Sequence, residues 1–201
     1  CYAASKMGMP LSKIIVAVNN NDILDRFFKN NDYSKTSVTE TISPSMDISV
    51  ASNFERLLYD FYLNRDSNKC SDHYTHFPNK GIKIDEKMWK KSSELFLSYS
   101  IDDDSTYECM QHFSENFDYI MDPHTAVAAK AVINLNKTLL NKTVIISTAH
   151  PAKFPIALEN AGINLNNMPK NLEKVLTMKE VGYKLSASDD SIFNFIKEKN
   201  K

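Results

Sequence analysis

The chain has 201 residues, enough for one large domain or two small ones, and its 42% hydrophobic and 24% charged content is that of an ordinary folded protein. Its 24 basic and 25 acidic residues leave a formal net charge of -1, so no overall field attracts nucleic acid. The longest apolar run is far too short to span a bilayer, and we therefore expect neither a nucleic-acid partner nor a membrane partner.

The first predicted elements are a helix and a strand. The helix covers Tyr2–Met7, and Gly8 and Pro10 end it. Because a domain rarely begins in the middle of a helix, we expect residues before Cys1 to belong to the same fold. The five consecutive apolar residues Ile14–Val18 predict a strand that is buried on both faces.

Helices and one polar excursion are predicted next. Helical spacing of apolar residues is found over 22–29 and again over 52–63, where Ser52–Glu55 resembles a capping box. The polar stretch 64–83 is interpreted as a surface loop. It holds a possible metal cluster of a cysteine and two histidines, but a solvated loop is the preferred interpretation and we predict no metal site; the three residues are Cys70, His73 and His76.

Further helices are predicted over 85–97 and 102–113. The acidic run Asp102–Asp104 opens the second of them, and helix capping is preferred over its alternative, cation binding. The cysteines lie far apart and form no CxxC pair, which indicates reduced thiols in a reducing compartment and hence a cytoplasmic location. A last helix is expected from Ser188 onward.

The most informative stretch is a second β-branched apolar run, Thr143–Ile146, that ends in small hydroxyl residues. It follows a predicted helix over 126–135, and Pro151 opens another helical stretch after it. Ligands of open α/β sheets bind beyond the carboxyl ends of the strands. Ser147 and Thr148 are therefore expected where a ligand would be met.

Strands that alternate with helices predict an α/β fold with a parallel sheet. Two strong strands are too few for a stable sheet, so we expect the partner strands in a missing N-terminal part. We divide the chain into three regions. Residues 1–63 are the C-terminal part of a cofactor-binding α/β domain, residues 64–117 are a mostly helical insertion, and residues 118–201 are the remainder of the α/β domain with a C-terminal helix.

Four stretches in this order resemble threonine synthase, in the branch found in fungi and many bacteria. They are IIVAVNNNDILD (14–25), TISPSMDISVASNFERLL (41–58), DPHTAV (122–127) and STAHPAKF (147–154). The resemblance implies the three-layer parallel-sheet domain of a fold-type II pyridoxal-phosphate enzyme. It also implies the conversion of O-phospho-L-homoserine and water to L-threonine and phosphate, a carbon–oxygen lyase reaction of threonine biosynthesis.

The resemblance places the catalytic lysine outside this chain. In the family, that lysine holds the cofactor as a Schiff base and a glycine-rich loop binds the cofactor phosphate; both belong to the N-terminal part of the pattern. The chain has only 4 glycines and no lysine in the family's lysine motif. We therefore expect the Schiff-base lysine upstream of Cys1, assign no catalytic residue here, and expect the isolated chain to be inactive.

One role carries over by resemblance: the hydroxyl of Thr148 faces the pyridine nitrogen of the cofactor. A neutral hydroxyl would donate a hydrogen bond and leave that nitrogen largely unprotonated, whereas an aspartate would keep it protonated. The alternative for Thr148 is a strand-end hydroxyl that caps the next helix. Asn19 is placed near the cofactor's rim by analogy, with a turn residue or helix cap as its alternative.

Three basic residues could meet the phosphate of the substrate: His124, His150 and Lys153. Capping and packing are the preferred interpretation for the two histidines, and a solvated helix surface is preferred for the lysine. Two other functions remain open for the protein. One is a threonine-synthase-like phospho-lyase or another fold-type II lyase, and the other is a non-catalytic α/β interaction module.

Overall fold

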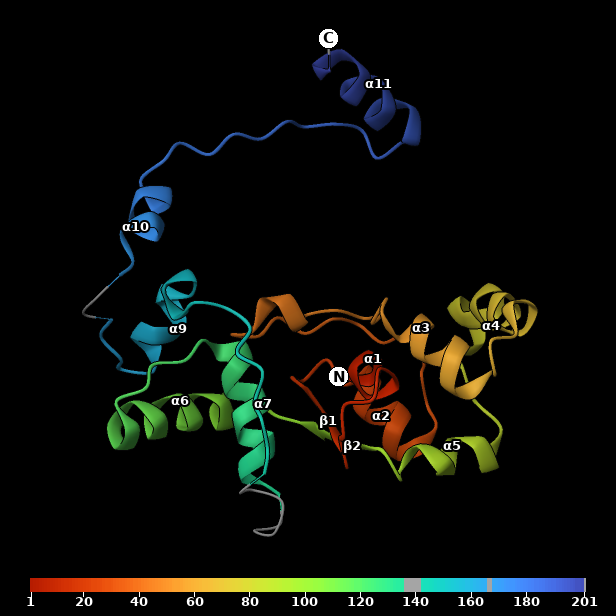
Figure 1. Cartoon of the computed structure of the whole chain (residues 1–201). Helices are drawn as coiled ribbons and strands as arrows, with labels where there is room; N and C mark the ends of the chain where they lie inside the picture. The colour runs from red at the N-terminus through yellow and green to blue at the C-terminus, as the bar shows by residue number, and fades with distance from the viewer. Residues whose placement is uncertain (136–141, 166–167, 201) are drawn as a thin grey trace. The chain divides into compact units, whose positions relative to one another are not determined.

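The computed structural model describes residues 1–135, 142–165 and 168–200 (Figure 1). The chain divides into two compact units, Cys1–Leu165 and Asn166–Lys201. None of the helices in the described ranges is long and apolar enough to cross a membrane.

A two-stranded parallel sheet lies in the first unit. Strand β1 (Ile14–Val18) follows helix α1 (Tyr2–Lys6), which confirms the first predicted strand at its predicted bounds. It pairs with β2 (Phe96–Ser100) in a register that sets Ile14 opposite Phe96 and Val18 opposite Ser100. Helix α2 (Ile23–Asn30) connects β1 to the following loop.

The prediction of one helix over 85–97 was wrong in its second half. Helix α5 (Glu86–Ser92) is shorter, and the residues after it form β2. The sequence of β2 is Phe-Leu-Ser-Tyr-Ser, and its side chains alternate between buried and less buried positions. This period of two is the pattern of a strand, and aromatic residues favour strands.

The stretch 64–83, predicted as a surface loop, is mostly helix. Helix α4 (Ser67–Lys80) has its N-cap at Asp66, whose side chain accepts a hydrogen bond from the N–H of Lys69. Cys70 and Phe77 are buried on its inner face, although most of its other residues are exposed and polar. The cap at Asp66 and the burial of Cys70 and Phe77 therefore suffice to stabilise a helix that has few apolar residues.

The remaining helices of the first unit overlap predicted ones, except the short η1, which was not predicted, and the predicted helix over 52–63 is an α-helix followed by a π-helix. They are η1 (Pro44–Met46), α3 (Phe54–Leu57), the π-helix η2 (Leu58–Tyr62), α6 (Asp103–Phe117), α7 (Pro123–Ile133), η3 (Pro151–Lys153) and α9 (Pro155–Asn160). Asp102 accepts a hydrogen bond from the N–H of Ser105 at 2.8 Å, which confirms the capping interpretation of the acidic run.

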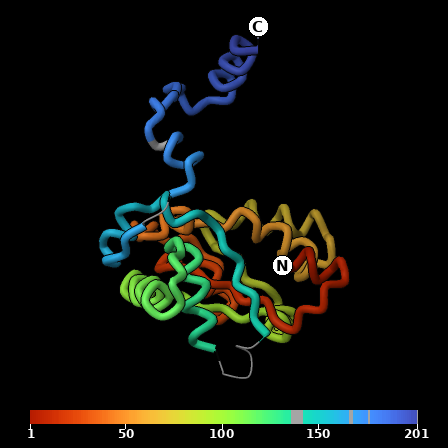
Figure 2. Tube along the Cα trace, turned by 60° about the vertical axis from the view of Figure 1, so that its left-hand side comes forward, coloured from red at the N-terminus to blue at the C-terminus, as the bar shows by residue number. Residues whose placement is uncertain are grey.

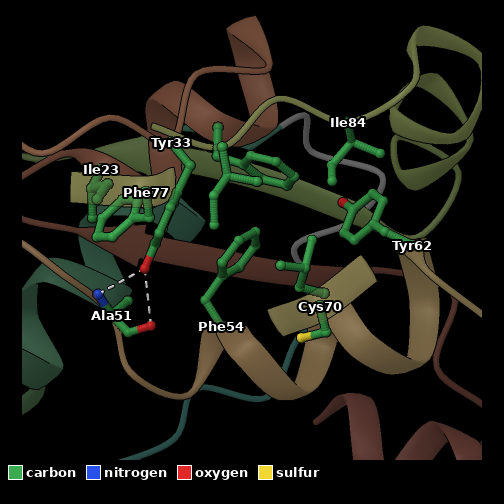
Figure 3. Packing of buried hydrophobic residues seen from close by; sticks show 11 residues of the cluster. Ile23, Tyr33, Ala51, Phe54, Tyr62, Cys70, Phe77 and Ile84 are labelled. Carbon is green, nitrogen blue, oxygen red and sulfur yellow. Dashed lines mark hydrogen bonds between the residues drawn. The ribbon is translucent and has the colours of Figure 1, made fainter. Parts of the chain in front are cut away.

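An aromatic core joins α2, α3 and α4 beside the sheet (Figure 3). The rings of Phe27 and Phe54 lie with their centroids 4.6 Å apart, and Tyr33 stacks on Phe54 at 4.3 Å. The buried hydroxyl of Tyr33 donates to the carbonyl of Ala51 and accepts from its N–H, both at 3.0 Å. Burial raises the pKa of Tyr33 to about 12, so this hydroxyl stays protonated and can donate.

The predicted buried strand Thr143–Ile146 is not present as such. The segment is extended, but within the described ranges no backbone hydrogen bond joins 144–147 to a neighbouring strand, and Figure 2 shows it as part of a long teal trace. Val144 is 83% exposed and Ile146 is 60% exposed. The residue types favour an extended backbone, but a strand is buried only where another strand and a covering layer lie beside it.

The second unit contains α10 (Lys170–Leu176) and α11 (Asp189–Lys199). Ser188 caps α11 by accepting a hydrogen bond from the N–H of Ser191, which confirms the predicted start of the last helix. None of its described side chains is buried, and it exposes a series of apolar residues that includes Val175, Met178, Val181, Tyr183, Phe193 and Ile196.

Candidate functional site

The DPHTAV motif builds the start of α7 around the carboxylate of Asp122. Asp122 is completely buried, and its Oδ1 accepts hydrogen bonds from the N–H groups of His124 at 3.0 Å and Thr125 at 3.4 Å. The hydroxyl of Thr125 donates to Oδ2. Pro123 occupies the first turn, where a missing N–H costs nothing, and the negative charge is favourable at a helix N-terminus.

The same carboxylate joins α7 to the STAHPAKF segment. The N–H of Ala149 lies 3.4 Å from Asp122 Oδ2, and the N–H of Thr148 donates to Thr125 Oγ1 at 3.1 Å. The Thr148 hydroxyl lies 3.3 Å from Thr125 Oγ1 and 3.4 Å from Asp122 Oδ1, while its side chain stays open to solvent. Asp122 therefore positions the turn that carries the predicted cofactor contact.

The charge of Asp122 follows from its surroundings. Burial alone would raise the pKa of this carboxyl, but the hydrogen bonds from His124 and Thr125 outweigh burial and keep the pKa below its ordinary value. The carboxylate is ionised at neutral pH and can only accept hydrogen bonds. Its negative charge lies directly behind the Thr148 hydroxyl.

His124 connects Asp122 to the loop around η1. Its Nε2 accepts a hydrogen bond from the N–H of Ser45 at 3.1 Å, and its Nδ1 lies 3.0 Å from Asp122 Oδ1. Because Nε2 must keep its lone pair to accept, the proton sits on Nδ1 and the ring is neutral. Both nitrogens are thus engaged inside the protein, in agreement with the packing interpretation of His124.

Asn19, at the end of β1, is a buried hub of polar contacts with only 1% of its surface exposed. Its Nδ2 lies 2.7 Å from Thr41 Oγ1 and 2.8 Å from Asp47 Oδ1, and its Oδ1 accepts from the N–H of Asn21 at 2.9 Å. These contacts hold the loop 39–47 against the carboxyl end of β1. The contact of Asn19 with a cofactor stays a prediction.

Asp47 completes this hub, and the sequence reasoning did not single it out. It accepts hydrogen bonds from the N–H of Thr41 at 2.9 Å and from the Thr41 hydroxyl at 2.7 Å, besides those from the two asparagines. A signal was present, because Thr41, Ser43 and Asp47 are hydrogen-bonding residues within seven positions of one motif. Their partner Asn19, however, lies more than twenty residues away in sequence and could not be identified from spacing.

The other two basic candidates lie outside these clusters. His150 Nδ1 accepts a hydrogen bond from the N–H of Ala152 at 3.2 Å, so this histidine caps η3, as the preferred interpretation holds. Lys153 is exposed, as predicted. Within the described ranges, no three His, Cys, Asp or Glu side chains come close enough to hold a metal ion.

Comparison with known proteins identifies the family. Residues 125–196 match the family model "Threonine synthase, C-terminal". The threonine synthase of Pseudomonas aeruginosa is 39% identical to this chain over 162 residues, which are 81% of this chain and 34% of that enzyme. The chain therefore spans about a third of the length of this relative.

Solved threonine synthases have the same fold. The enzyme from Brucella melitensis, described as PLP bound, matches 98% of this chain with a TM-score of 0.80 and 29% identity, and the match covers 42% of that chain. The yeast enzyme matches 99% of this chain with a TM-score of 0.79 and 32% identity, covering 44% of that chain. The α/β fold with a parallel sheet is thereby confirmed. This chain belongs to the threonine synthase family, and its match lies in the C-terminal part of that family's sequence.

Proposed function

We propose that the chain is the C-terminal portion of a pyridoxal-phosphate-dependent threonine synthase that converts O-phospho-L-homoserine and water to L-threonine and phosphate. The observation that carries the proposal is the Thr148 turn. Its hydroxyl is open to solvent at the end of an extended segment, and Asp122 and Thr125 hold it in place from behind. The Brucella relative is described as PLP bound, which supports this cofactor.

The residues of this chain fit one side of the cofactor. The Thr148 hydroxyl can meet the pyridine nitrogen, and Asn19 supports the loop 39–47 that we place near the cofactor's rim. When bound, the cofactor supplies the electron sink for the carbon–oxygen lyase reaction. No residue of this chain is assigned to the Schiff base or the phosphate loop, so we propose that the chain alone is inactive and binds the cofactor weakly.

The division of the chain is part of the proposal: an α/β part over 1–63, a mostly helical insertion over 64–117 that also supplies β2 to the sheet, and the rest of the α/β domain over 118–201. We also propose a cytoplasmic location. The free thiols of Cys1, Cys70 and Cys109 support a reducing compartment.

The activity test compares the chain alone with a completed enzyme. The chain is joined in one polypeptide to the part of the Pseudomonas aeruginosa enzyme that it does not match, and both proteins are assayed with O-phospho-L-homoserine and pyridoxal phosphate. Threonine and phosphate are expected from the joined protein only. Formation of 2-ketobutyrate instead would favour the phospho-lyase, and a cooperative melting transition indifferent to pyridoxal phosphate, with no turnover, would favour the interaction module.

The role of Thr148 is tested in the joined protein by Thr148→Val, which keeps the shape and removes the hydroxyl. Loss of one hydrogen bond to the cofactor should weaken pyridoxal-phosphate binding about tenfold, measured by absorbance titration. The matched control is Ser147→Ala, which removes the neighbouring exposed hydroxyl and should leave binding unchanged. Equal affinity of Thr148→Val and the unmodified protein would show that Thr148 does not contact the cofactor.

A further inference from the structure

The hydrogen bonds around Asp122 determine where the protons of two neighbouring hydroxyl groups lie. The Thr125 hydroxyl donates its only proton to Asp122 Oδ2, so the Thr125 oxygen can only accept hydrogen bonds from other groups. It accepts one from the N–H of Thr148 at 3.1 Å. The Thr125 oxygen and the Asp122 carboxylate therefore both act as acceptors toward the hydroxyl of Thr148.

The Thr148 hydroxyl has these acceptors on its protein side. Its oxygen lies 3.3 Å from Thr125 Oγ1, and 3.4 Å and 3.5 Å from the two oxygens of Asp122. These distances are long for hydrogen bonds, so the attraction is mainly between the carboxylate charge and the hydroxyl dipole. A hydroxyl has a single proton, and here the charge draws it toward the protein. The lone pairs of the oxygen then face the exposed side.

The charge of Asp122 is not compensated by a cation. Among the described residues, its one ion-pair partner within reach is His124. That ring is neutral, because its Nε2 accepts a hydrogen bond from the N–H of Ser45 and its Nδ1 carries the proton. A completely buried anion therefore lies behind the exposed Thr148 hydroxyl and favours a positive charge on the other side of that hydroxyl.

We infer that Asp122 sets the polarity of the Thr148 hydroxyl, so that Thr148 accepts a hydrogen bond from a protonated ring nitrogen of the cofactor instead of donating to an unprotonated one. The inference rests on the proposed function, from which it takes the contact between Thr148 and the pyridine nitrogen. Asp122 is a positioning residue, because it acts through Thr148. The nitrogen takes its proton from water when the cofactor binds, and a protonated ring is the stronger electron sink.

This polarity is the reverse of what the sequence predicts for Thr148. A neutral hydroxyl taken by itself would donate to the nitrogen and leave it largely unprotonated. The folded chain adds a buried carboxylate behind that hydroxyl, from a residue 26 positions away in sequence. The hydroxyl thereby transmits part of the effect that an aspartate in its place would have.

The inference is tested by ¹⁵N NMR of the joined protein, loaded with pyridoxal phosphate that carries ¹⁵N in its ring. The free cofactor at acidic and at alkaline pH supplies the reference shifts of the protonated and the unprotonated nitrogen. At pH 7, the bound cofactor should show the shift of the protonated nitrogen. The shift of the unprotonated nitrogen would overturn the inference. This measurement needs no variant and does not depend on whether a variant folds.

Asp122→Asn separates the positioning role from a merely structural one. The neutral amide no longer attracts the hydroxyl proton and can donate to the Thr148 oxygen, so the ring nitrogen should change to the unprotonated shift. A structural role would reduce the amount of cofactor bound and leave the shift of the bound cofactor unchanged, which would overturn the inference. Thr148→Ser keeps the hydroxyl and should keep the protonated shift. So should the control Asp104→Asn, which removes an exposed carboxylate of α6.

Failure of the proposed function would give a different result. If Thr148→Val bound pyridoxal phosphate as tightly as the unmodified joined protein, Thr148 would not contact the cofactor, and the proposed contact and the inference would both be overturned. If Thr148→Val weakened binding but the nitrogen of the unmodified protein were unprotonated, the contact would stand and only the inference would be overturned.

Discussion

Strand β1 and the extended segment 144–147, here called the open edge, are made from the same kind of residues, but among the described residues only β1 has a neighbouring strand. Both are short runs dominated by isoleucine and valine. All five residues of β1 pair with β2, whereas the open edge has no ladder partner within the described ranges and exposes Val144 and Ile146. β-Branched side chains thus favour an extended backbone, but the backbone becomes part of a sheet only where a second strand lies beside it.

The turn that follows the open edge is nevertheless fixed by hydrogen bonds. It carries Thr148 and Ala149, whose N–H groups reach Thr125 and Asp122. The turn is therefore positioned by α7 rather than by a sheet. This difference predicts that substitutions along β1 and β2 cost stability, that those at Asp122 cost less, and that those at the exposed Val144 and Ile146 cost almost none.

The largest effect is expected for Phe96→Ala on β2. Phe96 is buried opposite Ile14 and stacks on Phe28 with 5.0 Å between ring centroids. Truncation should lower the free energy of unfolding by about 3–5 kcal/mol, measured by urea denaturation. Ile146→Ala on the open edge is the control and should change it by less than about 0.5 kcal/mol. Equal effects would mean that the paired strands are no more important to the fold than the unpaired one.

Asp122→Asn should have the next largest effect. The amide keeps the size of the carboxylate but loses its charge and part of its acceptor capacity toward His124 and Thr125, at a cost of about 2 kcal/mol in the free energy of unfolding at pH 7.

The pH dependence gives a second measurement of Asp122. Its pKa is lowered on folding, so its stabilisation is complete above the unfolded value of about 4 and is lost as the pH falls through the folded value. Urea unfolding between pH 7 and pH 3 should therefore decline less steeply for Asp122→Asn than for the unmodified chain. The exposed Asp104, changed to Asn, is the control. Parallel pH profiles of all three proteins would contradict the role of Asp122.

Local signals predicted much of the fold. The caps at Asp102 and Ser188 and the apolar run Ile14–Val18 were identified from sequence because each depends on residues a few positions apart. Strand β2 was missed because its short aromatic alternation follows directly on a helix. Helix α4 was missed because its few apolar residues are diluted among polar ones.

The site was predictable only in part. The DPHTAV motif indicated a capped helix, and resemblance to the family indicated Thr148. The contact between His124 and Ser45 joins residues 79 positions apart, and no local pattern shows it. Asn19 was identified as a strand-end residue, but its complete engagement with Thr41 and Asp47 depends on the folded loop.

A smaller effect, of opposite sign, is expected for Ser98→Ala on β2. The Ser98 hydroxyl is buried and has no hydrogen-bond partner among the described residues. Removing an unsatisfied hydroxyl should raise the free energy of unfolding by up to about 1 kcal/mol, measured by urea denaturation. Thr106→Ala on α6 is the control, since its buried hydroxyl donates to the Asp102 carbonyl at 2.7 Å and its loss should destabilise. Destabilisation by Ser98→Ala would reveal a partner for that hydroxyl.

The smallest effect should come from Val144→Thr on the open edge. Threonine has the shape of valine, and at a residue that is 83% exposed its hydroxyl remains hydrated, so the free energy of unfolding should change by less than about 0.5 kcal/mol. The matched substitution in β1 is Val18→Thr, at a position that is 8% exposed, where a buried hydroxyl should cost about 1–3 kcal/mol. Urea denaturation of the two variants side by side isolates burial from residue type, because the chemical change is identical. If Val144→Thr cost as much as Val18→Thr, the side chain of Val144 would have to be covered in the folded chain, contrary to its exposure.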